Sequence, residues 1–345
     1  MTLVPMRALL DRAAEDGYGL AAFNVNSMVQ VQAVMEAADA TDSSVIVQAT
    51  TGARAFAGDL YLLHLVQAAA ERYPHIPFAF HHDHANSPES CYSAIELGFT
   101  SVMMDGSLLA DRKTPSDFEY NVRVTREVVQ RAHAAGVTVE GELGTIGGIE
   151  DGHGANESRL TDPGQAVEFV RRTGVDALAV AIGTSHGAYK FDRPPDGSVL
   201  AMDRIVEIHR RLPDVHLVMH GSSSVPARLI ESINGHGGAL HTTFGVPVDE
   251  IQRGIRHGVR KINVDTDNRL AITGAIRKVL AETPEKFDPR DYLKPAREAM
   301  KKVVALRMTQ FGQAGHAGDY KPIPIAEIAK GYKDGTLSTR PLVAK

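Results

Sequence analysis

The sequence is poor in several residue types that mark particular classes of protein. It has one cysteine and no tryptophan among 345 residues. A lone thiol, Cys91, cannot form an intramolecular disulfide, which favours a reducing compartment and predicts a cytoplasmic protein. Lysine and arginine (37) are outnumbered by aspartate and glutamate (42), so the net charge of −5 gives no support to nucleic-acid binding.

Long apolar runs are also missing. No stretch approaches the roughly 18 consecutive apolar residues that a membrane span needs, so we expect no membrane partner. The N-terminal segment carries Pro5, Arg7, Asp11, Arg12 and Glu15 among its apolar residues. That pattern is typical of an amphipathic helix and not of a signal peptide.

The chain alternates short apolar runs with longer stretches of helical period. The predicted strands cover residues 20–25, 44–49, 78–82, 101–105, 137–142, 176–182, 216–220 and 260–265. The predicted helices cover residues 27–40, 59–73, 88–97, 116–135, 163–172, 202–212, 226–234, 247–257 and 268–282. Short runs that are apolar on both faces are typical of parallel strands covered by helices. Eight strand–helix units therefore predict an α/β fold, a (β/α)8 TIM barrel with extra helices and a C-terminal extension.

No linker rich in serine, glycine or proline divides the chain, and its composition does not shift along its length. We therefore interpret residues 1–345 as a single TIM-barrel domain. A doubly wound parallel sheet in two domains is the alternative.

The stretch from Phe78 to Asn86, FAFHHDHAN, is the densest group of titratable residues. An apolar strand ends there in three histidines and Asp83, and Ser87-Pro88 follows as a helix cap and first helical residue. This is where α/β barrels carry their chemistry, because the carboxyl ends of all strands meet at one mouth. The other predicted strands also end in polar residues: Asn24, Thr50, Asp105, Glu140 with Glu142, Ser185 with His186, His220 with Gly221, and Asn263 with Asp265.

Three histidines, His84, His186 and His220, end the third, sixth and seventh predicted strands. Three imidazoles that converge at a barrel mouth form a metal site with an open position for substrate, as in catalytic zinc centres. No HxxxH or CxxC spacing brings them together, so this prediction depends on the barrel. Taken singly, each is more often a histidine satisfied by the core or a loop.

Residues 220–224, HGSSS, form a turn of small residues with free backbone N–H groups, and Pro226 begins a helix directly after it. Such a turn at a helix N-terminus suits a phosphate, and barrels often bind phosphate after strands seven and eight. Asn263, Asp265 and Thr266 are expected beside it. The alternative is a serine-rich turn that only caps the helix.

The loop 144–154, GTIGGIEDGHG, combines five glycines with Glu150 and Asp151. A flexible solvated loop is the default interpretation of that composition. The more specific interpretation is a lid that brings a base to the substrate.

The chain resembles the class II, metal-dependent fructose-1,6-bisphosphate aldolases and, within them, the Calvin-cycle-type branch. The motifs that carry the resemblance run through nearly the whole chain: YGLAAFNVN, VIVQA, HHDH, SVMMDGS, VEGELG, GGIEDG, GTSHGAYKF, VMHGSSSVP, KINVDTD and FGQAGHAGDYKPI. The implied activity is reversible cleavage of D-fructose 1,6-bisphosphate to dihydroxyacetone phosphate and D-glyceraldehyde 3-phosphate, in glycolysis, gluconeogenesis or the Calvin cycle. Tagatose or sedoheptulose bisphosphate is the alternative substrate.

The resemblance also implies roles for individual residues. Zinc would be held by His84, His186 and His220, the catalytic aspartate would be Asp83, and Glu150 would be the base of the lid. Glu142 matches a residue that binds the metal ion in an alternative position. Asp105 is also predicted to be a metal ligand, although it matches a substrate-binding position as well. The implied substrate-binding residues are Asn24, Thr50, Gly187, Gly221, Ser222, Ser223, Asn263, Asp265 and Thr266.

Further ions and partners follow from the same resemblance. A second divalent ion is expected besides zinc, and a monovalent cation, Na+ or K+, would be bound by backbone carbonyls around Ser185, Gly187 and Gly221. The expected assembly is a homodimer or homotetramer, and the expected partners are sugar bisphosphates and triose phosphates.

The chain departs from the family pattern at two places. Thr50 stands where a serine is usual, which adds a methyl group near the substrate. Many members have two adjacent glutamates in the lid, whereas this chain has Ile149 before Glu150.

Retro-aldol cleavage requires removal of the proton of the C4 hydroxyl and stabilisation of the resulting carbanion beside a carbonyl. Zinc can stabilise the enediolate as a Lewis acid, Asp83 can move the hydroxyl proton, and Glu150 can exchange the proton of dihydroxyacetone phosphate. A Schiff base on Lys190 or Lys261 is the competing aldolase chemistry, but it leaves the histidines without a role. A metal-dependent hydrolase would also use three histidines at a barrel mouth, and so would a barrel whose metal serves only folding or assembly.

Overall fold

The computed structural model describes residues 2–109, 111, 113–148, 159–187, 189–320 and 323–337. Within these residues, eight parallel strands close into a barrel in the order β1-β10-β9-β7-β5-β4-β3-β2. The barrel strands are β1 (Leu20–Asn24), β2 (Val45–Thr50), β3 (Phe78–Ala85), β4 (Ser101–Met104), β5 (Thr138–Leu143), β7 (Ala177–Val180), β9 (His216–Met219) and β10 (Val259–Val264). The predicted TIM barrel is therefore confirmed, and the alternative of an open doubly wound sheet is wrong.

Two short strands were not predicted. β6 (Gly147–Gly148) and β8 (Ser185–His186) pair in parallel as a separate small sheet. β8 carries one of the predicted metal ligands, so this ladder fixes the backbone of a site residue.

The barrel strands are buried on both faces, as the apolar runs predicted. Inside the barrel, small and medium side chains from the strands form one apolar cluster with the first helix, α1 (Met6–Asp16). Met6, Leu9 and Leu10 of that helix are fully buried in the cluster. The amphipathic N-terminal helix thus covers the barrel interior at the end where the strands begin.

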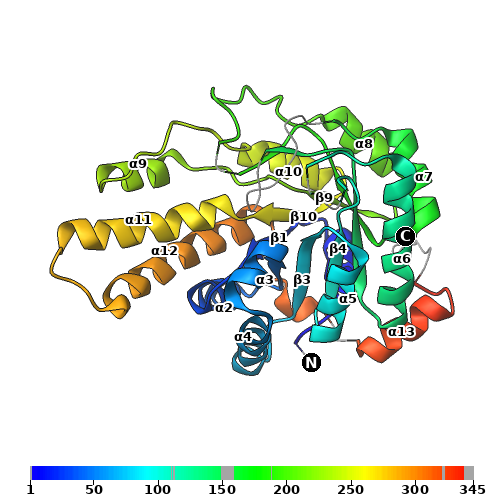
Figure 1. Cartoon of the computed structure of the whole chain (residues 1–345), viewed down its shortest axis with the longest axis horizontal. Coiled ribbons are helices and arrows are strands. Elements are labelled where there is room, and N and C mark those ends of the chain that lie inside the picture. The colour runs from blue at the N-terminus through cyan, green and yellow to red at the C-terminus, as the bar shows by residue number, and fades with distance from the viewer. Residues whose placement is uncertain are drawn as a thin grey trace.

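Helices surround the barrel, as Figure 1 shows. They are α2 (Met28–Thr41), α3 (Thr51–Ala57), α4 (Asp59–Arg72), α5 (Pro88–Leu97), α6 (Phe118–Ala134), α7 (Pro163–Thr173), α8 (Met202–Arg211), α9 (Ala227–Gly235), α10 (Val248–Arg256), α11 (Thr266–Glu282), α12 (Pro289–Gln310), the 3-10 turn η1 (Ala317–Asp319) and α13 (Ile325–Lys333). α5 begins as predicted, since the Ser87 hydroxyl accepts a hydrogen bond from Ser90 N and Pro88 occupies the first helical position. No helix of the described residues is long and apolar enough to cross a membrane.

The predicted extra helices and C-terminal extension are present. α11 and α12 form a helical hairpin that extends away from the barrel together with α9 (Figure 1). A buried ion pair holds the base of this hairpin, with Arg307 Nη2 2.7 Å from Asp267 Oδ2. α13 packs against α6, where the Tyr332 ring stacks on His133 and its hydroxyl donates to Asp176.

Candidate active site and metal centre

The end of β3 turns so that several polar side chains reach the barrel mouth. His81 and Asp83 lie on the same side of the strand, with His81 Nε2 3.5 Å from Asp83 Oδ1, whereas His82 points toward α5. His84 has a φ of +50°, and the pairing of β3 with β4 changes register beside it. A left-handed non-glycine residue costs about 1–3 kcal/mol, and such strain gathers at functional sites. Here it breaks the alternation of the strand and turns His84 toward His220.

The three histidines that were predicted as metal ligands converge. His84 Nε2 lies 2.9 Å from His220 Nδ1, and the His186 ring centroid lies 5.0 Å from that of His84. Each histidine offers one ring nitrogen within 4.8 Å of the other two. Burial lowers the pKa of His220, and burial with the neighbouring imidazoles lowers the pKa of His186 well below its ordinary value. Both rings are therefore neutral, which is the form that binds a metal ion.

The outer nitrogens of two of these rings are fixed by carboxylates. His84 Nδ1 donates to Asp105 Oδ2 at 3.1 Å, and His220 Nε2 donates to Glu140 Oε1 at 2.7 Å. With those protons in place, His84 Nε2 and His220 Nδ1 face each other with lone pairs. Two lone pairs at 2.9 Å repel unless they share a proton or a metal ion. A carboxylate behind a histidine ligand is also the arrangement that orients such ligands in metal sites. These residues therefore fit a zinc ion.

A second group of possible ligands adjoins the first. His84, Asp105 and Glu142 each offer an atom within 4.8 Å of the others. The Ser107 hydroxyl lies 2.6 Å from Asp105 Oδ1 and 3.1 Å from Glu142 Oε1, and its single proton can serve one of them at a time. Burial and the nearby charge of Asp105 raise the pKa of Glu142 well above its ordinary value. A proton or a cation is thus needed between these carboxylates.

Asp83 is fully buried beside the histidines. Its Oδ2 accepts hydrogen bonds from Gln48 Nε2 at 3.1 Å and Asn263 Nδ2 at 3.2 Å. Burial alone would raise the pKa of Asp83, but the positive charge of Lys261 holds it well below its ordinary value. Asp83 is therefore an anion that can accept a proton.

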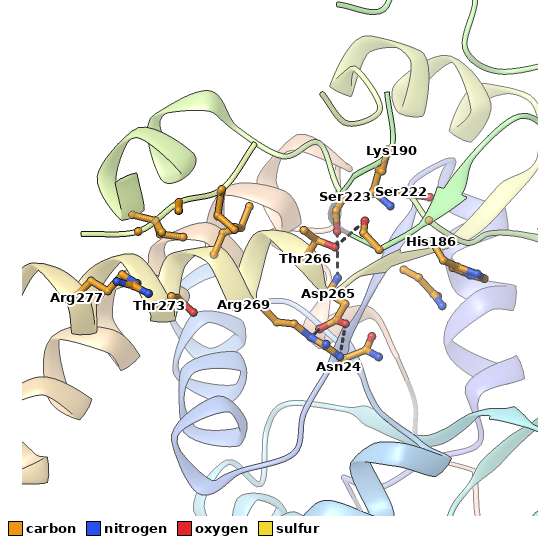
Figure 2. Close-up of a pocket in the computed structure, with 18 residues that line it drawn as sticks. Asn24, His186, Lys190, Ser222, Ser223, Asp265, Thr266, Arg269, Thr273 and Arg277 are labelled. Atoms are coloured by element: carbon orange, nitrogen blue, oxygen red, sulfur yellow. Dashed lines mark hydrogen bonds and ion pairs between the residues drawn. The ribbon is translucent and has the colours of Figure 1, made fainter. Parts of the chain in front are cut away.

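A cavity of about 260 Å3 opens beside His186. Figure 2 shows the residues that line it. Ser223 Oγ accepts from Asp265 N at 3.2 Å, and Thr266 Oγ1 donates to Gly187 O at 3.2 Å. Of the residues matched to substrate-binding positions, all except Thr50 and Asp105 line the cavity: Asn24, Gly187, Gly221, Ser222, Ser223, Asn263, Asp265 and Thr266. The Thr50 hydroxyl instead accepts from Ala53 N and caps α3.

Lys190, Arg269 and Arg277 line the same cavity, and none of these three cations was predicted as a substrate contact. Lys190 lines it and donates from Nζ to the Ser185 carbonyl, and Arg269 lines it and pairs with Asp265 at 2.7 Å. Lys190 was considered only as a Schiff-base residue, and the sequence contained one signal for Arg269, its place one helical turn after Asp265. Both charges suit an anionic ligand.

The predicted phosphate turn has fewer available backbone N–H groups than expected. The Asp267 carboxylate accepts from Val225 N at 2.8 Å and from Ser224 N at 3.3 Å, so these amides are already used. The backbone of Gly221, Ser222 and Ser223 remains along the cavity. The helix that follows, α9, begins at Ala227 with Pro226 as its cap residue.

The lid was predicted to bring Glu150 to the substrate, and both Glu150 and Asp151 lie outside the described residues. The described parts show how the base of the loop is held. Thr145 and Arg159 exchange two backbone hydrogen bonds of 3.0 and 2.8 Å, and Gly148 pairs with His186 in the small sheet. The base of this loop is therefore tied directly to His186, one of the predicted metal ligands.

The comparisons with known proteins agree with this geometry. A family model described as fructose-bisphosphate aldolase class-II matches residues 4–316. A fructose-bisphosphate aldolase of Nostoc commune is 61% identical over 98% of this chain and 98% of its own length. A fructose-bisphosphate aldolase class 2 of a Synechocystis species is 60% identical over the same shares of the two chains.

Solved structures give the same result at lower identity. The crystal structure of the YdjI aldolase of Escherichia coli K12 matches with a TM-score of 0.72 and 28% identity, and covers 91% of this chain and 99% of that one. A putative fructose-1,6-bisphosphate aldolase of Coccidioides immitis matches with a TM-score of 0.71 and 28% identity over 90% and 96% of the two chains. The chain therefore belongs to the class II fructose-bisphosphate aldolase family, a family of lyases.

Proposed function

We propose that this protein catalyses the reversible aldol cleavage of D-fructose 1,6-bisphosphate to dihydroxyacetone phosphate and D-glyceraldehyde 3-phosphate with a zinc ion held by His84, His186 and His220. The observation that carries the proposal is the 2.9 Å approach of His84 Nε2 and His220 Nδ1. The outer nitrogens of the same two rings are hydrogen-bonded to Asp105 and Glu140, so the two facing atoms present lone pairs that a proton or a metal ion can share.

When bound, zinc would act as a Lewis acid toward the ketone oxygen and the negative charge that develops there. Asp83, the buried anion beside His84, takes the proton of the C4 hydroxyl when the bond between C3 and C4 breaks. Gln48 and Asn263 hold its Oδ2 by hydrogen bonds, which orient the carboxylate for this transfer. Glu150 is assigned the proton exchange at the carbon of dihydroxyacetone phosphate.

The phosphate groups are assigned to the cavity beside the histidines. The backbone of residues 221–223 offers N–H groups, Thr266 lines the same cavity, and Lys190 and Arg269 supply positive charge. Fixed donors around a dianion hold the substrate in a single orientation relative to Asp83.

Further ions, the assembly and the cell compartment complete the proposal. A second divalent ion would lie at His84, Asp105 and Glu142. A monovalent cation would lie near the Ser185 carbonyl, which already accepts a hydrogen bond from Lys190 Nζ. Residues 1–345 are proposed to fold as one TIM-barrel domain that works in the cytoplasm as a homodimer or homotetramer, in glycolysis, gluconeogenesis or the Calvin cycle.

The experiment is a coupled assay of triose phosphate formation from fructose 1,6-bisphosphate. EDTA should abolish cleavage without unfolding the protein, and zinc should restore it. Tagatose and sedoheptulose bisphosphates, tested in parallel, decide the substrate preference. Release of inorganic phosphate without triose phosphates would identify a hydrolase, and full activity after exhaustive chelation would overturn the zinc assignment.

A further inference from the structure

A lysine is buried in the barrel directly beneath the active site. Lys261 lies in the middle of β10 and has no solvent exposure. Its ammonium Nζ lies 2.9 Å from Glu140 Oε2 and 3.5 Å from Asp83 Oδ1. Both carboxylates are also fully buried. A charge in such a position is costly unless it is compensated, so this arrangement of three ionised groups calls for a role.

His81 completes the group. Its Nε2 lies 3.5 Å from Asp83 Oδ1 and 3.4 Å from Glu140 Oε2, and its Nδ1 lies 2.7 Å from Ser101 Oγ. Burial and the positive charge of Lys261 lower the pKa of His81, so its imidazole is neutral. The ammonium of Lys261 is then the cation between the two carboxylates.

Each carboxylate presents one oxygen to Lys261 and the other to the active site. Glu140 Oε1 accepts from His220 Nε2 at 2.7 Å, and Asp83 Oδ2 accepts from Asn263 Nδ2 at 3.2 Å. Lys261 is therefore in direct contact with the proposed acid–base group, Asp83, and one residue removed from a proposed zinc ligand, His220. Without its charge, the two carboxylates would repel each other across the barrel interior.

We propose that Lys261 is a positioning residue for this active site. Its ammonium holds Glu140 against His220 and Asp83 against Asn263, and thereby sets the zinc affinity of the three-histidine site. The inference rests on the proposed function, since it takes these histidines as the zinc site. It also removes Lys261 as a Schiff-base nucleophile, because its amine lies between two buried carboxylates and has no contact with solvent.

The test compares three variants. Lys261→Met keeps a long unbranched side chain without charge, Lys261→Arg keeps the charge, and Lys278→Met removes an exposed lysine of α11 as the control. Each protein is stripped of metal, its thermal unfolding is recorded, and its zinc affinity is measured by competition with a chromophoric chelator. The visible spectrum of the Co2+-loaded proteins reports the ligand geometry.

We expect Lys261→Met to unfold cooperatively and to bind zinc about 10- to 100-fold more weakly, the usual effect of losing a residue behind a metal ligand. Its Co2+ spectrum should change because His220 is no longer fixed. Lys261→Arg should recover much of the affinity, and Lys278→Met should match the wild type. Zinc binding by Lys261→Met within about threefold of the wild type, or an equal loss in Lys261→Arg, would overturn the proposal.

A double variant checks that the effect passes through Glu140. Lys261→Met combined with Glu140→Gln should bind zinc about as weakly as Glu140→Gln alone, because both changes break the same connection. A loss of zinc affinity in the double variant that equals the product of the two single losses would contradict that route. If neither Lys261 variant nor the double variant folds, Lys261 serves folding alone and the proposal is wrong. A wild-type protein that binds no zinc would refute the proposed function itself, which separates the two failures.

Discussion

Replacing Gly221 by alanine should damage substrate binding more than stability. Gly221 has a φ of +62°, and a Cβ at this position would lie 2.4 Å from Ser185 O and 2.7 Å from Ser185 C. Non-bonded carbon atoms meet at roughly 3.5 Å, so one of the two backbones must move by about 1 Å. Ser185 belongs to β8 together with His186, so the shift moves either the proposed phosphate turn or a proposed metal ligand.

The expected effect can be estimated from this displacement. A misplacement of ~1 Å in an active site can cost on the order of 100-fold in rate. We expect kcat/KM for fructose 1,6-bisphosphate to fall by about that factor, with a rise in KM and in the inhibition constant of inorganic phosphate. The left-handed backbone adds roughly 1–2 kcal/mol of strain, which a thermal melt would report.

Gly197 supplies a matched control. It has a φ of +88°, yet a Cβ there would meet nothing within 4 Å. Gly197→Ala should therefore show the backbone strain alone, with normal steady-state kinetics. A Gly221→Ala enzyme whose KM and phosphate inhibition equal those of Gly197→Ala would refute the place assigned to this turn.

Three further predictions concern the named site residues. His84→Ala, His186→Ala and His220→Ala should each lose bound zinc and cleavage while remaining folded, and stoichiometric zinc with normal turnover in any of them would remove that residue from the site. Asp83→Asn should keep its metal and lose about 10²–10⁴-fold in kcat, because it abolishes proton transfer and nearly preserves shape; a kcat within about threefold of the wild type would assign the proton to another group. Glu150→Gln should abolish exchange of the dihydroxyacetone phosphate proton with tritiated water while Asp151→Asn does not, and the reverse result would exchange their roles.

Much of the fold follows from the sequence because each barrel strand is a short apolar run with its own helix. The predicted strands recur within a few residues of their ends in the structure. β3 continues to Ala85, three residues past the predicted end, because polar residues at a barrel mouth still pair with neighbouring strands. β6 and β8 were missed because two-residue strands have no periodicity to detect.

The candidate site was predictable in part for a related reason. Residues at the carboxyl ends of parallel strands must meet, so His84, His186 and His220 could be grouped without local spacing. Lys261 and Glu140 are different, because β5 and β10 are not neighbours in the barrel. Their contact depends on the way the strands are staggered across the interior. Thr50 was predicted only as a substrate-binding residue, and the start of α3 showed that its hydroxyl caps a helix.

The central claim is that three histidines from separate strands hold the catalytic metal. Crystals of the zinc-loaded protein, measured on both sides of the zinc absorption edge, test it directly. The prediction is an anomalous peak within about 2.0–2.1 Å of His84 Nε2, His220 Nδ1 and a ring nitrogen of His186. A peak confined to His84, Asp105 and Glu142, or one at His81, Asp83 and Glu140, would contradict the account.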